Sequence, residues 1–274
     1  EIADGDWSSD VCSSDLIMIQ VENLYKSFGD LDVLRDISFE IRDGETISII
    51  GRSGSGKSVL MKHLIGLLKP DQGHVHVDGV DLCCVSYEEL REIRTRFGVL
   101  FQGGALFDSM TSAENVAFPL RYFADMTEAG VQDRVKECLD LVRLSGVGPK
   151  KPSELSGGMR KRVALARAIA LEPRYILYDE PTSGLDPETS NTIDELINSL
   201  ARELNVTSVV VTHDMHSVLT IADRAAFLHE SRLHWIGPVA DIHNSPDPVL
   251  DAFVKANEYH VGDPSAIPSL QQNR

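Results

Sequence analysis

The stretch GRSGSGKS, residues 51–58, combines glycines with a lysine and a serine in an order suited to phosphate binding. Its glycines let backbone N–H groups turn inward around phosphate oxygens. Lys57 offers a positive charge to the β- and γ-phosphates, and Ser58 offers a hydroxyl ligand to Mg²⁺. A glycine-rich turn before a core helix is the alternative, but the apolar run before the loop and the helical pattern after it favour a nucleotide-binding loop. The residues expected to contact the nucleotide here are Gly51, Arg52, Ser53, Gly54, Ser55, Gly56, Lys57, Ser58 and Val59.

Two adjacent carboxylates end the apolar run YILYDE, residues 175–180. Ligands in open α/β folds bind at the carboxyl edge of the sheet, where such a strand ends. Asp179 is therefore expected to hold the metal ion, directly or through water, and Glu180 to act as the base that faces an attacking water. An acidic pair after a strand is by itself more often a solvated pair, so this assignment depends on the phosphate loop.

A second glycine pair, Gly157 and Gly158, opens a segment that otherwise reads as a strong basic helix, LSGGMRKRVALARA. Glycine is a poor helix former, so its use here indicates that the backbone approaches another group closely. Together with Ser156, the pair places a hydroxyl and N–H donors at the positive end of a helix, which suits an anion. We expect that anion to be a nucleotide phosphate.

Short β-branched runs alternate with helical stretches from Ile17 onward, which is typical of a mainly parallel sheet covered by helices. The expected strands are IMIQVEN, ISFEI, TISII, RFGVLF, YILYD, TSVVVT and RAAFLH. We predict an α/β fold in which residues 17–240 form one domain, with an α-helical subdomain inserted at about residues 103–160. Residues 241–274 are expected to form a partly disordered C-terminal extension with a helix near residues 247–256.

Composition narrows the class of protein. The 274 residues carry a formal net charge of −16, which argues against nucleic acid as a partner over a broad surface. No apolar run is long enough for a membrane-spanning helix, so any membrane role is expected to come through a partner. The cysteines have neither C-x-x-C nor Cys/His metal spacing and are predicted to be reduced, packed thiols. They are Cys12, Cys83, Cys84 and Cys138.

The first sixteen residues need a separate interpretation. The stretch DWSSDVCSSDL, residues 6–16, lacks the positive region and the apolar core of a signal peptide. It is also the translation of a common short-read sequencing adapter, so we predict that residues 1–16 are not native, with a disordered acidic tail as the alternative. Resequencing the locus from genomic DNA tests this, because recovery of the same codons in frame would support a native tail.

Six motifs follow one another in an ordered series: the phosphate loop, VLFQ, LSGGM, YDEP, SGLD and VVVTHD. In order and spacing they resemble the nucleotide-binding subunits of ATP-binding-cassette (ABC) transporters over about residues 17–238. The resemblance implies a P-loop NTPase with a RecA-like core, an antiparallel β edge and the inserted helical subdomain. It also implies that a second copy completes each ATP–Mg²⁺ site, with Ser156, Gly157 and Gly158 of one copy against the γ-phosphate held by the other.

The same resemblance assigns further roles residue by residue. Gln102 would contact Mg²⁺ or the lytic water, and His213 would contact the γ-phosphate and orient water. Asp186 would lie at the dimer seam, and Phe28, with Tyr25 as the alternative, would stack on adenine. The expected catalytic residues are thus Glu180, His213, Lys57 and Gln102, and the expected metal ligands are Ser58, Gln102 and Asp179.

Two positions depart from the family pattern. Val59 lacks a hydroxyl that many members have at this position, so ATP affinity is expected to fall by about 0.5–1.5 kcal/mol. Met159 stands where glutamine is usual, and activity is expected to be kept because the backbone donors before it remain.

Met159 and the stretches LFQGGALFDSMTSAENVAFPLR and GMRKRVALARAIALEP look like the ATPases of bacterial Mla/Mce lipid transport systems. This resemblance implies a peripheral protein at the cytoplasmic face of the inner membrane that works with an integral permease and a substrate-binding lipid-transport protein. The expected cargo is phospholipid or another hydrophobic molecule. One alternative is an importer or exporter of another cargo. The other is a soluble ABC ATPase acting on ribosomes or DNA. This second alternative is disfavoured by the single phosphate loop, the absence of sustained heptads and the acidic charge.

Overall fold

The computed structural model describes residues 17–258, and its centre is a six-stranded sheet with the order β10-β9-β3-β8-β7-β6. The strands are β3 (Thr46–Ile50), β6 (Phe97–Leu100), β7 (Tyr175–Asp179), β8 (Thr207–Thr212), β9 (Arg224–His229) and β10 (Arg232–Pro238). Neighbours run parallel except β10, which is antiparallel to β9. β3 and β8 are buried along their whole length, as their apolar sequences predict.

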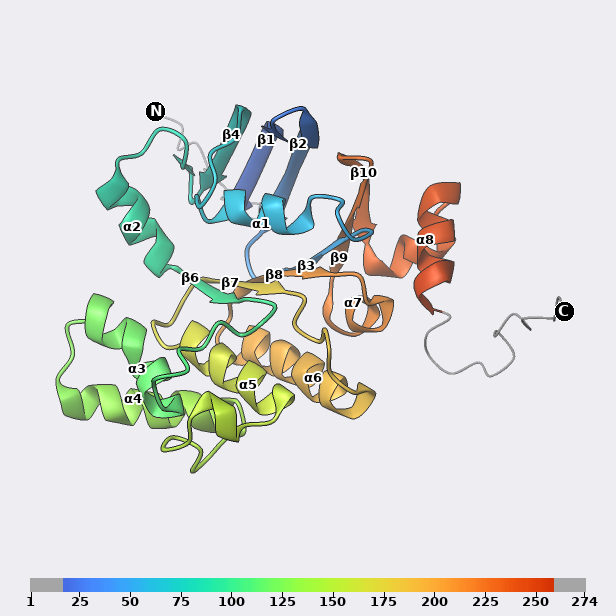
Figure 1. Cartoon of the computed structure of the whole chain (residues 1–274). Helices are drawn as coiled ribbons and strands as arrows, with labels where there is room; N and C mark the ends of the chain where they lie inside the picture. Colours follow the sequence, from blue (N-terminus) through green and yellow to red (C-terminus); the bar gives the residue numbers. More distant parts are fainter. Residues whose placement is uncertain (1–16, 259–274) are drawn as a thin grey trace, which may run out of the picture.

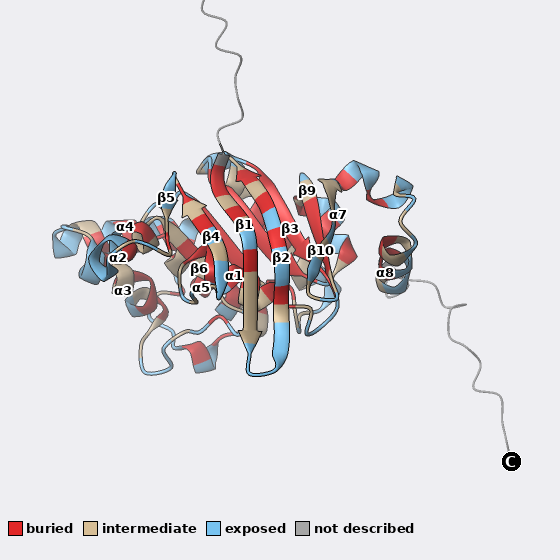
Figure 2. Ribbon diagram, turned by 90° about the horizontal axis from the view of Figure 1, so that it is seen from above, coloured by how far each residue is buried: buried red, intermediate tan, exposed pale blue. Residues whose placement is uncertain are grey.

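A second, four-stranded antiparallel sheet has the order β2-β1-β4-β5 and lies over the first (Figures 1 and 2). Its strands are β1 (Ile17–Phe28), β2 (Leu31–Arg42), β4 (Gln72–Val77) and β5 (Val80–Asp81). Sequence analysis missed β4, which reads QGHVHV, because histidines occupy the face that alternates with the buried Val75 and Val77. It also missed β10, an edge strand without a fully buried residue.

Helices cover the other face of the six-stranded sheet (Figure 1). They are α3 (Ser112–Phe123), α4 (Glu128–Leu141), α5 (Gly157–Ala168) and α6 (Pro187–Glu203). The chain between β6 and α5 contains α3, α4 and one short 3₁₀ turn (Pro152–Glu154) but no strand. The remaining helices are α1 (Lys57–Leu64), α2 (Tyr87–Thr95), α7 (Met215–Ile221) and α8 (Pro248–Glu258).

Three apolar clusters hold these layers together. One joins the two sheets around α1, and a second joins the six-stranded sheet to α3, α4, α5 and α6. In the third, Leu250, Phe253 and Val254 of α8 pack against Met215 of α7 and Phe227 of β9. The C-terminal helix expected from the sequence is therefore docked on the domain, and it lies close to the carboxyl ends of the central strands.

Within residues 17–258, no helix combines the length and apolar character needed to cross a bilayer. The predictions for residues 1–16, including Cys12, and for the end of the C-terminal extension fall outside the described residues.

Candidate nucleotide-binding site

The phosphate loop leads from β3 into α1 and leaves the start of that helix open. α1 begins after Gly56, whose φ of 97° lies in the left-handed region, and no side chain caps the helix. A Cβ atom at Gly56 would lie 2.8 Å from the carbonyl oxygen of Val33 and from Leu34 Cδ2, so only glycine fits. The N–H groups of the first turn of α1 are therefore available to an anion.

Lys57 is folded back over the loop. Its side chain is 7% exposed, and Nζ donates to the carbonyl oxygens of Gly51 at 2.8 Å and Arg52 at 3.0 Å. Burial lowers the pKa of Lys57, while the carboxylates of Glu180 and Asp179 act in the opposite direction. The ammonium group is thus held in a partly desolvated position, where it would interact strongly with phosphate oxygens.

The hydroxyl of Ser55 offers an independent test of whether the loop fits a phosphate. Its Oγ atom is buried and has no hydrogen-bond partner within the described chain. An unpaired buried hydroxyl is unfavourable, and a phosphate oxygen would satisfy it. The composition and conformation of the loop therefore suit a polyphosphate.

Ser58 and Asp179 meet where α1 begins and β7 ends. The hydroxyl of Ser58 donates to Asp179 Oδ1 at 3.0 Å. Hydroxyl and carboxylate oxygens are the ligands that Mg²⁺ prefers, and these two are close enough to share one ion. The side chains present thus fit the magnesium ion that the sequence predicts.

Glu180 and His213 form a second pair of interacting side chains in this region. Nδ1 of His213 lies 2.9 Å from each carboxylate oxygen of Glu180, which fixes the plane of the carboxylate. Glu180 has a φ of 48°, an uncommon value for a residue other than glycine, and its N–H donates to the carbonyl oxygen of Val211 at 2.8 Å. The strained backbone aims the carboxylate at the end of the sheet, where it can accept a proton from a water molecule.

One pocket collects most of the predicted site residues. Its lining includes Arg52, Ser53, Gly54, Gly56, Lys57, Ser58, Val59, Gln102, Glu180 and His213. Val33 of β2 and three residues of α8, Phe253, Ala256 and Asn257, complete it. Sequence analysis missed the α8 residues because no motif covers that helix; only its apolar spacing was visible.

Lys161 is a functional candidate that sequence analysis also missed. This buried side chain donates from Nζ to the carbonyl oxygens of Gln102 and, at 3.1 Å, of Glu180. Burial lowers the pKa of Lys161, and the carboxylates of Glu180 and Asp179 oppose that shift. By tying together the loops after β6 and β7, Lys161 positions both pocket residues. Its place in a basic helix gave no signal of this role.

The glycine pair before α5 lies apart from this pocket. Ser156 accepts the N–H of Met159 at 3.3 Å, in the manner of a helix N-cap. Neither Ser156 nor Gly157 nor Gly158 belongs to the pocket lining found among residues 17–258. A nucleotide held by the phosphate loop would not touch them within this chain.

Asp186 and Phe28 are not brought into the pocket either. Asp186 caps α6 by accepting the N–H of Thr189 at 3.0 Å and its hydroxyl at 2.7 Å. Phe28 ends β1 with 49% of its surface exposed, and Lys26 Nζ lies 5.4 Å from its ring centroid. The roles assigned to these two residues, and the alternative Tyr25, remain predictions.

Comparison with known proteins connects this geometry to a family. The sequence profile described as "ABC transporter" matches residues 34–183. The "Probable ribonucleotide transport ATP-binding protein mkl" of Mycobacterium leprae is 44% identical over 238 residues, which cover 87% of this chain and 69% of that protein. The "Intermembrane phospholipid transport system ATP-binding protein MlaF" of Haemophilus influenzae is 41% identical over 238 residues, which cover 87% and 90%.

A solved structure shares the fold. The ATP-binding cassette MJ0796, described as a dimer in a post-hydrolysis state bound to ADP and Pi, matches with a TM-score of 0.75 and 34% identity. The match covers 81% of this chain and 99% of that one. The predicted fold class, an ABC ATPase cassette with a mainly parallel core and an antiparallel sheet, is thereby confirmed.

Proposed function

The chain belongs to the ABC transporter family of ATPases, and we propose that it homodimerises around two ATP–Mg²⁺ and drives a separate membrane permease for phospholipid or another hydrophobic cargo. The observation that carries this proposal is the convergence of Lys57, Ser58, Glu180 and His213 on one pocket. This set can hold a polyphosphate and present a base to water. Such an arrangement suits hydrolysis better than binding alone.

In the proposed reaction, the phosphate loop and Lys57 would bind the β- and γ-phosphates, and Ser58 and Asp179, with Gln102, would hold Mg²⁺. The ion, when bound, neutralises charge on the transferring phosphoryl group. Glu180 accepts a proton from the attacking water, and His213 keeps the carboxylate in place and contacts the γ-phosphate. Lys161 fixes the backbone on which Gln102 and Glu180 stand.

The residues at the start of α5 support a nucleotide site that two copies share. Ser156, Gly157 and Gly158 form the start of α5, outside the pocket of their own chain. A second copy would bring this helix start to the γ-phosphate, where its N–H groups and positive dipole favour an anion. Hydrolysis would then remove the shared anion and loosen the pair, which links chemistry to movement of the permease.

The surface of α3 supports a docking site for a permease helix. Its exposed aromatic side chains, Tyr122 and Phe123, continue toward Phe107, and ring contacts link Phe107, Phe118 and Tyr122. Glu114 and Arg121 border a groove beside them. Apolar grooves of this kind accept a short helix through apolar anchors. We propose that a cytoplasmic helix of the permease occupies it, which places this ATPase at the cytoplasmic face of the inner membrane.

The lipid cargo rests on the relative named for phospholipid transport and on the Mla/Mce-like sequence around α3. The relative named for ribonucleotide transport supports a second candidate, because it is 44% identical. A substrate-binding lipid-transport protein is an expected third partner under the first proposal. Nucleic acid is not expected as a partner, given the net charge of −16.

Purification of the tagged chain with its permease from native membranes tests the function. Reconstituted in liposomes, the complex should transfer a fluorescent phospholipid in an ATP-dependent manner, and Lys57→Ala should abolish transfer. ATP-dependent ribonucleotide movement without phospholipid transfer would select the second candidate. Recovery of the chain with ribosomes or DNA, and with no membrane protein, would show the proposal to be wrong.

A further inference from the structure

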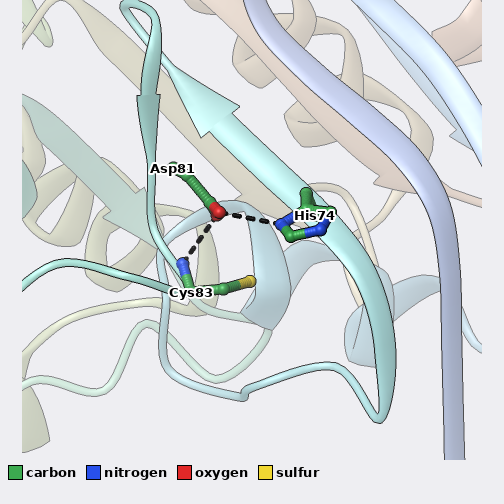
Figure 3. A group of neighbouring side chains, drawn as sticks. All are labelled: His74, Asp81 and Cys83. Atoms are coloured by element: carbon green, nitrogen blue, oxygen red, sulfur yellow. Dashed lines mark hydrogen bonds and ion pairs between the residues drawn. The ribbon is translucent and has the colours of Figure 1, made fainter.

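A group of metal-ligating side chains lies on the β4–β5 hairpin, outside the nucleotide pocket (Figure 3). Nδ1 of His74 is 2.8 Å from Asp81 Oδ2, and the N–H of Cys83 donates to Asp81 Oδ1 at 2.9 Å. One ligand atom from each of His74, Asp81 and Cys83 falls within 4.8 Å of the other two. A nitrogen, an oxygen and a sulfur donor therefore face one small volume.

Strand pairing explains why these residues meet. β4 and β5 pair antiparallel with His76 opposite Asp81, and His74 follows the same face two residues away. Cys83 comes two residues after Asp81, in the chain that leaves β5. The run HVHVDGVDLCC has no familiar metal spacing, which is why sequence analysis predicted only packed thiols.

Two further donors border the group. Sγ of Cys84 lies 3.1 Å from Asp81 Oδ2, and the Cys84 side chain is exposed. Nδ1 of His76 is buried and has no hydrogen-bond partner among the described atoms, and its ring centroid is 6.0 Å from that of His74. The prediction of packed thiols is thus wrong for Cys84, while Cys138 is buried as expected.

We propose that this group is a binding site for Zn²⁺, with His74, Asp81 and Cys83 as ligands and the exposed Cys84, whose Sγ lies 3.1 Å from Asp81 Oδ2, turning in as the fourth. Imidazole, carboxylate and thiolate together are typical of zinc, whereas Mg²⁺ and Ca²⁺ select oxygen alone. Zn–N and Zn–S bonds of about 2.0 and 2.3 Å place tetrahedral ligands roughly 3.3–3.8 Å apart, and the donor atoms of His74, Asp81 and Cys83 already lie within 4.8 Å of one another.

The position of the site indicates what the ion would do. The ligands join β4, β5 and the segment that enters α2 through its N-cap, Ser86. None of the four lines the nucleotide pocket defined above. A bound ion would clamp this edge of the antiparallel sheet, and its effect is expected on stability rather than on ATP hydrolysis.

Titration of the EDTA-treated full-length protein with Co²⁺ tests the site. We expect one equivalent to produce a thiolate-to-cobalt charge-transfer absorption, which Zn²⁺ then removes, and we expect Zn²⁺ to raise Tm. Cys83→Ser and His74→Gln should each weaken Co²⁺ binding at least tenfold. Cys138→Ser is the matched thiol control and should leave the spectrum unchanged.

Circular dichroism and the ATPase rate of each variant establish that it is folded. If the wild-type protein gives no thiolate band, the contacts are only a His–Asp ion pair and the proposal is overturned. The same follows if Cys83→Ser and His74→Gln bind Co²⁺ as tightly as wild type. Because the readout is metal binding, its failure would leave the proposed transport function intact.

Discussion

The phosphate loop and the start of α5 are both glycine-rich helix N-termini, yet they stand in different surroundings. At α1, Lys57 is buried over the loop and the pocket also contains Glu180 and His213. At α5, Ser156 caps its own helix, and Ser156, Gly157 and Gly158 do not line that pocket. Within one chain, the pocket at α1 thus combines glycines with charged side chains, whereas the start of α5 lies outside that pocket. The contrast supports a site that two copies complete.

The two glycines of α5 also differ from each other in how much space the chain leaves for a side chain. A Cβ atom at Gly158 would collide with Cγ2 of Thr189 in α6, so its own chain excludes a side chain there. A Cβ atom at Gly157 would lie 3.4 Å from Leu185 Cδ2, which is ordinary contact. Packing within the chain therefore explains Gly158 but not Gly157. Close approach of the proposed partner's nucleotide would supply a reason for glycine at position 157.

Glu180→Gln should give the largest effect, because it removes the proposed base while keeping the shape of the side chain. We expect ATP hydrolysis to fall by about 10²–10⁴. ATP should still bind, and the protein should accumulate as a closed dimer on size exclusion, since the shared anion persists. Glu188→Gln, an exposed substitution at the start of α6, is the control. A parental hydrolysis rate in Glu180→Gln would remove this residue from its proposed role.

How far the sequence could predict this contrast depends on the range of the contacts. The phosphate loop, β7 and β8 were visible because glycine spacing and apolar runs are local signals. Lys161 and the α8 residues of the pocket were not, since they meet their partners through packing between distant segments. The His74 group is local in sequence, but its residues meet only because β4 pairs with β5. The collision that explains Gly158 likewise involves Thr189, 31 positions later in α6. The pattern of residues along the chain does not show which residues come into contact in the folded protein.

Gly157→Ala tests whether the α5 donors act across the dimer. The added methyl group fits within its own chain, and alanine favours a helix, so Tm should stay the same or rise slightly. ATP-dependent dimerisation and hydrolysis should weaken about 10- to 100-fold, which corresponds to loss of one hydrogen bond to a charged group, roughly 1.5–3 kcal/mol. Unchanged dimerisation, measured by light scattering with ATP, would contradict the proposed approach of a phosphate to Gly157.

Gly158→Ala should instead destabilise the chain itself. The methyl group must displace Thr189, which holds Asp186 through its N–H and its hydroxyl, and overpacking of this kind costs about 1–3 kcal/mol. Urea unfolding of the protein without nucleotide measures this loss. The double variant Gly158→Ala/Thr189→Ser should recover most of it, because serine lacks Cγ2 but keeps the hydroxyl that Asp186 accepts. No recovery would mean that the collision is not the cause.

The last effect concerns a buried carboxyl in α6, outside the nucleotide pocket. Asp194 of α6 is 1% exposed, and it accepts the hydroxyl of Ser217 in α7 at 2.9 Å. Burial, assisted by the nearby Asp214 carboxylate, raises the pKa of Asp194 to about 6 from an ordinary value of 3.8, against the opposing hydrogen bond from Ser217.

The difference between the pKa of Asp194 in the native and unfolded states determines how stability changes with pH. Below pH 4 the carboxyl is protonated in both states and changes nothing. Between about pH 4 and 6 the unfolded chain ionises while the native one keeps its proton, so stability falls as pH rises; above 6 the loss is complete. Asp194→Asn should therefore gain about 1–3 kcal/mol in urea unfolding at pH 7.5 and about half as much at pH 5, in the middle of this window. The exposed Asp133→Asn should show no such difference, and an equal gain at both pH values would mean that Asp194 does not titrate as its burial requires.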